Sequence, residues 1–147
     1  MSVEENKAIA QRFIEAANSV MGNPDKMPAY IEEFFVPEFV CHLTTGDIDV
    51  KQFAALEHEL SDAFPDTKHL ITNLIADEDF VVIQRTGTMT HKGTYLGIAP
   101  TGKVIEVTGV DICRVVAGKF TEMTTLVNEM SIMQQLGTLP PTEEIGK

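Results

Sequence analysis

The chain has 147 residues, with 22 acidic residues against 11 Lys and Arg, and a formal net charge of −11. A chain of this length buries roughly 68 to 70% of the surface that it exposes when unfolded, so a single domain with one full core is expected. The acidic balance, with the basic residues scattered along the sequence, argues against nucleic acid and anionic membranes as partners.

Cysteine usage and apolar run length indicate the compartment. Cys41 and Cys113 show neither metal-ligand spacing nor a paired motif, so both are interpreted as reduced core thiols. The first residues contain two Glu and no apolar signal segment, and no apolar run approaches the roughly 18 residues of a membrane helix. We therefore expect a cytoplasmic protein in which residues 1–140 form one domain and residues 141–147 a flexible tail.

The N-terminal third has helical periodicity. Ser2 and Glu5 form a capping-box pattern at the start of a first helix that runs to about residue 21. A second short helix should end before Pro37, and a short strand, "FVCHL", follows. Asp49 is expected to cap a third helix that ends at the Phe-Pro pair. The outer face of this third helix is expected to be solvated: Glu57, His58, Glu59 and Asp62.

From residue 67 the pattern changes to strands. "TKHLITNLIA" and "FVVIQRTGTMTH" predict an antiparallel pair, in which His69 gives no signal beyond its place in a strand. A Gly-rich connection leads to a long strand from about Lys103 to Val116, a turn, and a last strand to about Met130. Helices followed by a meander indicate an α+β fold, whose curved sheet leaves its inner face partly open as a natural cavity.

One acid interrupts the apolar face of the long strand. Side chains alternate between faces along a strand, so Asp111 shares its face with Val107, Cys113 and other residues expected to be buried. A carboxylate in this position must find partners, remain protonated, or line a cavity that admits water or substrate. A structural acid and an acid in a binding site are equal alternatives at this point.

Several separated segments resemble a known family. They are "AFPDTKHLITNLIADEDFVVIQRTGTMTHKGTYLGIAPTGK", "RVVAGKF" and "MQQLGTLP". They are similar to the helix exit, the His-x-Gly loop, the strand turn and the terminal Gln-Leu-Gly of SnoaL-like polyketide cyclases. The resemblance runs from about Asn6 to Pro140 and implies the cone-shaped fold of nuclear transport factor 2, with three N-terminal helices on a curved, mostly antiparallel sheet. It is more specific for fold than for reaction, since one fold hosts many functions.

The resemblance also implies where catalytic groups lie. The family's cyclases use an aspartate on the last strand as general acid/base, and this position holds Thr125, whose hydroxyl cannot serve as a base alone. The family's partner histidine on the neighbouring strand corresponds to Asp111. A two-residue Ala117-Gly118 turn would place Asp111 opposite Thr124, and a bulge at Gly118 would place it opposite Thr125. The resemblance favours the bulge, and with it a hydrogen bond between Asp111 and Thr125.

Other candidate site residues carry weaker signals. The resemblance implies that His42 faces the cavity, where a core histidine bonded to the main chain is favoured slightly over a catalytic one. His91 either contacts a ligand or braces its loop, and bracing is favoured. Asn128 either orients a substrate carbonyl or bonds a turn. The remaining expected ligand-binding residues are aromatic: Phe13, Phe34 and Tyr95.

The sequence lacks a phosphate-binding glycine-rich loop, a nucleophile elbow and a His-rich metal set. We therefore expect catalysis without cofactor or metal: acid/base cyclisation, isomerisation or hydration/dehydration of a small carbonyl-bearing hydrophobic compound in an apolar pocket. The alternative is a non-catalytic ligand-binding or dimeric association domain that has lost the family's aspartate. The resemblance also implies a homodimer built through the outer face of the sheet, on these residues of the long strand: Val104, Glu106, Thr108, Val110 and Ile112.

Overall fold

The computed structural model describes residues 1–144, and its N-terminal helices form as the sequence predicts. α1 (Val3–Val20) starts at Ser2, whose hydroxyl accepts a hydrogen bond from the Glu5 backbone while the Glu5 side chain accepts one from the Ser2 backbone. The predicted capping box is therefore confirmed. A short 3-10 turn, η1 (Pro24–Lys26), leads into α2 (Met27–Phe34).

The third helix, α3 (Val50–Ala63), starts at the predicted cap. Asp49 accepts a hydrogen bond from the Gln52 backbone, and the Gln52 side chain accepts one from the Asp49 backbone, each at 2.9 Å. These reciprocal bonds satisfy donors that a helix start otherwise leaves unpaired. None of the helices within residues 1–144 is both long enough and apolar enough to cross a membrane.

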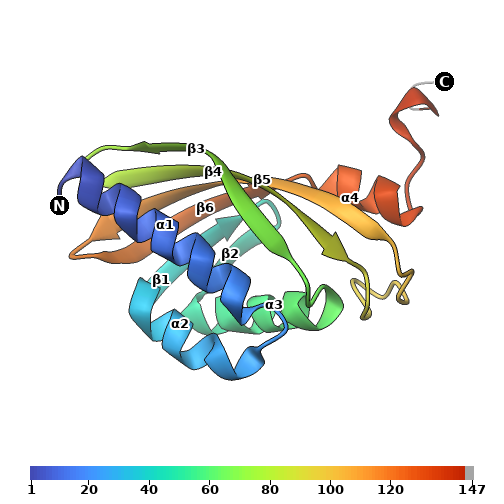
Figure 1. Ribbon diagram of the computed structural model, residues 1–147, viewed down its shortest axis with the longest axis horizontal. Helices are drawn as coiled ribbons and strands as arrows, with labels where there is room; N and C mark the ends of the chain where they lie inside the picture. Colours follow the sequence, from blue (N-terminus) through green and yellow to red (C-terminus); the bar gives the residue numbers. More distant parts are fainter. Residues whose placement is uncertain (145–147) are drawn as a thin grey trace.

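Six strands form one curved sheet in the order β2-β1-β6-β5-β4-β3. β1 runs parallel to β6, and every other neighbouring pair is antiparallel, so the predicted α+β fold is confirmed. Figure 1 shows α1, α2 and α3 on one side of this sheet. The bounds of the strands are Phe35–Leu43 (β1), Gly46–Asp49 (β2), Lys68–Ala76 (β3), Phe80–Thr90 (β4), Val104–Val116 (β5) and Lys119–Val127 (β6).

The structure departs from the predicted elements at β1 and β2 and at the end of β6. β1 is longer than "FVCHL", and the short β2 that pairs with it was not predicted. β6 ends at Val127 rather than near Met130, because Asn128 begins a fourth helix, α4 (Glu129–Leu136), which lies beside β5 in Figure 1. In the predicted tail, Thr142–Glu144 forms a 3-10 turn, η2, and residues 145–147 lie outside the described part of the chain.

The hairpin between β5 and β6 pairs Asp111 with Thr125 as predicted, but the bulge that causes this pairing lies at another position. Val116 pairs with Lys119 across a two-residue turn, yet Asp111 pairs with Thr125. The register shifts where Arg114 and Val115 face β6, so the bulge lies inside the hairpin and not at Gly118. One extra residue on β6 is what moves Thr125, rather than Thr124, opposite Asp111.

Two hydrophobic clusters fill the space between the helices and the inner face of the sheet. The larger is rich in aromatic rings, and the Phe13 ring lies 5.0 to 6.0 Å from those of Tyr30, Phe34 and Phe120. The smaller cluster includes Phe64 and lies toward α4. Apolar side chains also remain exposed on the opposite, outer face of the sheet: Leu70, Ile75, Val104, Ile112 and Leu126.

Candidate functional site

Asp111 is buried on the inner face of β5. Its neighbours in alternation, Val107 and Cys113, are buried as predicted, and Asp111 itself is only 3% exposed. Its carboxylate accepts hydrogen bonds from Arg85 Nε at 2.8 Å and Nη2 at 3.2 Å, one to each oxygen. The Thr125 hydroxyl donates a third at 2.8 Å. The carboxylate is thus held by a two-point ion pair and a hydroxyl, the arrangement that favours a charged carboxylate in a protein interior.

Arg85 reaches Asp111 from the adjacent strand because the residue opposite it is glycine. Arg85 on β4 pairs with Gly109 on β5, and a Cβ at Gly109 would lie 3.0 Å from the guanidinium carbon. Any larger residue at position 109 would press against the guanidinium. Burial alone would lower the pKa of Arg85, but the Asp111 carboxylate outweighs burial and raises it.

His69 on β3 lies on the other side of Arg85. Its Nδ1 is 3.4 Å from Arg85 Nη1. Burial, followed by the positive charge of Arg85, lowers the pKa of His69 to about 4. The imidazole is therefore neutral at pH 7, and Nδ1 can accept a hydrogen bond from the guanidinium.

Glu57 brings a second carboxyl group to this interior. The sequence placed Glu57 on the solvated face of α3, and that expectation is corrected. The residue is half-buried, and it lies four positions from both Phe53 and Ser61, which are buried. Burial raises the pKa of Glu57 to about 7, while the charge of Arg85 opposes this rise.

Tyr30 on α2 completes the group of polar side chains. It is 4% exposed, and its hydroxyl has no hydrogen-bond partner among residues 1–144. Burial raises the pKa of Tyr30 well above its ordinary value, and the charges of Glu57 and Asp111 raise it further. The hydroxyl is therefore a neutral donor held inside the protein. We call Tyr30, Glu57, His69, Arg85, Asp111 and Thr125 the interior polar cluster.

His42 does not belong to this cluster, which corrects the expectation that it faces a cavity. Cys41 is fully buried, so the alternation of β1 directs His42 to the outer face. There its Nδ1 lies 2.7 Å from Asp47 and its Nε2 lies 2.7 Å from Glu122. These bonds, first to Asp47 and then to Glu122, raise the pKa of His42.

The other predicted residues are dispersed. Phe13 and Phe34 pack in the aromatic cluster around Tyr30. His91 is fully buried beside Phe64, and its Nδ1 accepts a hydrogen bond from the Thr101 backbone at 3.2 Å. The Tyr95 ring lies 5.1 Å from that of Phe64. The structure therefore brings Asp111 and Thr125 together, and places Tyr95 against the smaller hydrophobic cluster and His91 beside Phe64 of that cluster.

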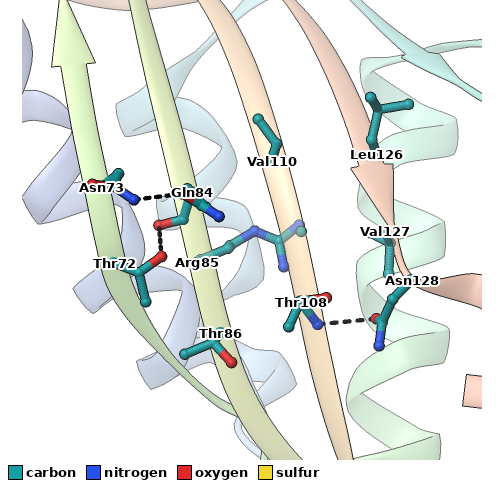
Figure 2. A pocket seen from close by; sticks show the side chains of 11 residues that line it. Thr72, Asn73, Gln84, Arg85, Thr86, Thr108, Val110, Leu126, Val127 and Asn128 are labelled. Carbon is teal, nitrogen blue, oxygen red and sulfur yellow. Dashed lines mark hydrogen bonds between the residues drawn. The ribbon is translucent and has the colours of Figure 1, made fainter. Parts of the chain in front are cut away.

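Two concavities are found among the described residues, and Arg85, the ion-pair partner of Asp111, lines the first of them. One, of about 580 Å³, is on the outer face of the sheet, and Figure 2 shows the polar and apolar side chains that line it. Asn128 is one of them, and its Oδ1 accepts a hydrogen bond from the Thr108 backbone at 2.9 Å. The other, of about 510 Å³, lies beside α2, between Met27 and Lys119. Neither corresponds to the apolar pocket expected inside the cone.

Sequence comparison identifies the family to which this architecture belongs. The family model described as SnoaL-like polyketide cyclase matches residues 8–136. The chain belongs to the SnoaL-like polyketide cyclase family. Among curated proteins, none matches this SnoaL-like chain.

Solved structures share the fold of this SnoaL-like protein. AclR of Streptomyces galilaeus, a candidate hydroxylase, is 26% identical, with a TM-score of 0.86 over 98% of this chain and 88% of its own. A candidate polyketide cyclase from Acidithiobacillus ferrooxidans is also 26% identical, with a TM-score of 0.77 over 93% and 98% of the two chains. A candidate SnoaL-like polyketide cyclase from Jannaschia sp. CCS1 is 20% identical, with a TM-score of 0.82 over 95% of each chain.

Sequence reasoning missed Arg85 and Glu57, although each carries a signal. Arg85 follows Val81 and Ile83 at strand spacing, so alternation places its side chain on the same inner face as these buried residues. Glu57 lies at helix spacing from Phe53, on the stripe that packs inward. The charge of Glu57 suggested solvent and Arg85 was not considered, whereas the periodicity indicates the interior for both residues.

Proposed function

We propose that this SnoaL-like protein performs cofactor-free acid/base chemistry on a small, carbonyl-bearing hydrophobic compound. The reaction class is cyclisation, isomerisation or hydration/dehydration, and the site is the interior polar cluster. Asp111 serves as the base, Thr125 orients its carboxylate, and Arg85 keeps that carboxylate charged.

One observation carries the proposal: a buried carboxylate paired with Arg85 and Thr125, next to a core rich in aromatic rings. An apolar interior with a few convergent polar groups is typical of small-molecule sites. A charged carboxylate in such a site can remove a proton from a carbon next to a carbonyl group. Side chains of the aromatic cluster must rearrange to admit the substrate, as side chains at ligand sites commonly do.

Proton exchange into a model ketone tests this proposal. The bicyclic ketone 2-tetralone, incubated with the protein in D₂O, should lose its α-proton NMR signals faster than in buffer alone. Asp111→Asn should reduce this acceleration by at least about tenfold, because a positioned base typically contributes about 10² to 10⁴ in rate. Asp47→Asn, the same change on the outer face, is the control. Equal acceleration by wild type and Asp111→Asn, or none by wild type, would contradict the proposal.

The alternative is a non-catalytic protein that binds a small ligand or associates as a dimer. It is favoured by the bonding of Asp111, since both carboxylate oxygens already accept hydrogen bonds from within the chain. This alternative expects a co-purified hydrophobic compound in native mass spectrometry, together with no exchange into 2-tetralone by any variant.

A further inference from the structure

Glu57 is the second carboxyl group of the interior, and its place on α3 directs it there. Phe53 and Ser61 lie one helical turn before and after Glu57, and both are buried. Residues four apart share one face of a helix, so the Glu57 side chain lies on the stripe of α3 that packs toward the sheet. Exposed acids lie on the opposite side of the same helix: Glu59 and Asp62.

Tyr30 gives an independent indication that a ligand belongs here. A hydroxyl removed from water without a partner costs free energy, and buried tyrosine hydroxyls usually have partners. The Tyr30 side chain is only 4% exposed, and its hydroxyl has no hydrogen-bond partner among residues 1–144. The charges of Glu57 and Asp111 add to the rise in the pKa of Tyr30 that burial causes, and the charge of Arg85 opposes it. A ligand oxygen between these groups would supply the missing acceptor.

We propose that Glu57 is the proton donor of the site, and that the Tyr30 hydroxyl donates a hydrogen bond to the same substrate oxygen. This inference rests on the proposed function, in which Asp111 is the base. The substrate class is then an enolisable ketone or aldehyde that enters uncharged, because the Arg85 and Asp111 charges already balance each other.

The proton transfers balance without any further reactant. Asp111 takes a proton from the carbon next to the carbonyl, and the electrons of that C–H bond form a C=C bond. The electrons of the C=O π bond move to oxygen, which takes the proton of the Glu57 carboxyl group, so the product is a neutral enol and Glu57 becomes a carboxylate. In a substrate whose enol is conjugated with a second C=C bond, Asp111 returns its proton to the far carbon of that bond while Glu57 regains the enol proton, which gives an isomer with the C=C bond moved. Attack of the enol carbon on a second carbonyl of the same molecule forms a C–C bond and breaks that carbonyl's π bond; Asp111 gives its proton to the new alkoxide and the enol O–H proton returns to Glu57, which closes a ring.

The surroundings of Glu57 suit a donor that works near neutral pH. Burial raises the pKa of Glu57 to about 7, so its carboxyl group is protonated below this value. Two carboxyl groups in environments that separate their protonation states are the usual basis for an acid and a base in one site. The titratable or charged groups that interact with Glu57 come from four elements: Tyr30 of α2, Cys41 of β1, Arg85 of β4 and Asp111 of β5.

Exchange into 2-tetralone, followed across pH, tests the inference. The wild-type rate should fall as the pH rises through about 7, where Glu57 loses its proton. Glu57→Gln and Tyr30→Phe should each lower the rate at pH 6 by at least about tenfold, and Glu57→Gln should also lose the falling limb. Glu59→Gln removes the same charge from the exposed side of α3 and should keep both the rate and the profile.

The outcomes separate the inference from the proposed function. If Glu57→Gln keeps the wild-type rate and profile while Asp111→Asn loses activity, the inference is overturned and the proposed function stands. If wild type does not accelerate exchange at all, both fall. Carbon-13 NMR of labelled glutamate carboxyl groups is the second readout, and it does not depend on turnover. One resonance should titrate near pH 7 in wild type and Glu59→Gln and be missing in Glu57→Gln, whereas titration of every glutamate below about pH 5.5 would overturn the inference.

Discussion

Glu57 should make the stability of the protein depend on pH. Its pKa is about 7 in the folded protein and about 4.5 as a free side chain, so the folded state holds a proton that the unfolded chain releases. The stabilisation is fully present below pH 4.5 and is lost as the pH rises through 7. Glu57→Gln cannot ionise, so its free energy of unfolding relative to wild type should rise by about 2 to 3 kcal/mol over this window.

Urea denaturation at a series of pH values measures this difference. Glu59→Gln, on the exposed side of α3, should follow the wild-type profile throughout. Profiles of wild type and Glu57→Gln that stay parallel would show that the Glu57 carboxyl group is ionised in the folded protein at neutral pH.

Two hydroxyl groups of the interior polar cluster should respond oppositely to removal. The Thr125 hydroxyl donates to Asp111 at 2.8 Å, so Thr125→Val should lower the free energy of unfolding by about 1 to 3 kcal/mol. The Tyr30 hydroxyl has no partner among the described residues, so Tyr30→Phe should leave stability unchanged or raise it by about 1 kcal/mol. Chemical denaturation of both variants at pH 7 makes the comparison, and an equal loss in both would mean that Tyr30 has a structural partner.

Residues of this cluster differ in how well the sequence predicted them. Asp111 was recognisable because apolar residues flank it on its face of the strand. The hairpin alone left Thr124 and Thr125 open as its partner, and the family resemblance favoured Thr125, which the structure pairs with Asp111. The burial of Arg85 was not recognisable from the sequence, because a single cation on a strand is usually solvated. Its burial depends on the pairing of β4 with β5, which the long connection from His91 to Lys103 leaves undetermined by local rules.

Elements were predicted best where a cap fixes them. The caps at Ser2 and Asp49 are local patterns with a stated geometry, and the structure has both. The two-residue turn of the last hairpin was one of two alternatives, and the longer loop with a bulge at Gly118 was favoured over it. Ala117 and Gly118 both take positive φ values, 50° and 80°, as the two-residue turn requires. The bulge that sets Asp111 opposite Thr125 carries no comparable sequence signal, so the sequence predicted its effect and misplaced its position.

The loop at His91 should depend on a close approach to α3. The backbone N–H groups of Lys92 and Gly93 both donate to the Ala63 carbonyl, at 2.9 and 3.1 Å. A Cβ at Gly93 would lie 2.4 Å from the Asp62 carbonyl oxygen, and backbone cannot easily move aside. Gly93→Ala should therefore cost about 1 to 3 kcal/mol in urea denaturation, whereas Thr94→Ala, at the exposed neighbouring position, should cost little. An unchanged midpoint for Gly93→Ala would mean that the loop is not held against the helix.

At the scale of the whole molecule, the two faces of the sheet differ in how far they are covered. The inner face is covered by three helices, while the outer face exposes apolar side chains on several strands, with Val104 69% and Leu126 50% exposed. Exposed apolar residues that gather on one face of a protein often mark an interaction surface. The net charge opposes association, since each copy carries a net charge of −11 and two copies repel each other.

The exposed apolar side chains and the net negative charge together predict a homodimer that is joined through the outer face of the sheet. Its affinity should increase with salt concentration. Screening shortens the range of the repulsion between copies and leaves apolar burial intact, so the dissociation constant should fall as NaCl rises from about 0.02 to about 0.3 M. Sedimentation velocity at micromolar concentration should show a species of twice the chain mass.

Two variants test whether the outer face is the interface. Ile112→Glu places a charge on the outer face of β5 and should yield monomer. Leu96→Glu, at an exposed apolar residue of the turn between Tyr95 and Ile98, should remain dimeric. A wild-type protein that stays monomeric at both salt concentrations would contradict the predicted interface. Dissociation by both variants alike would show that added charge, rather than the outer face, controls association.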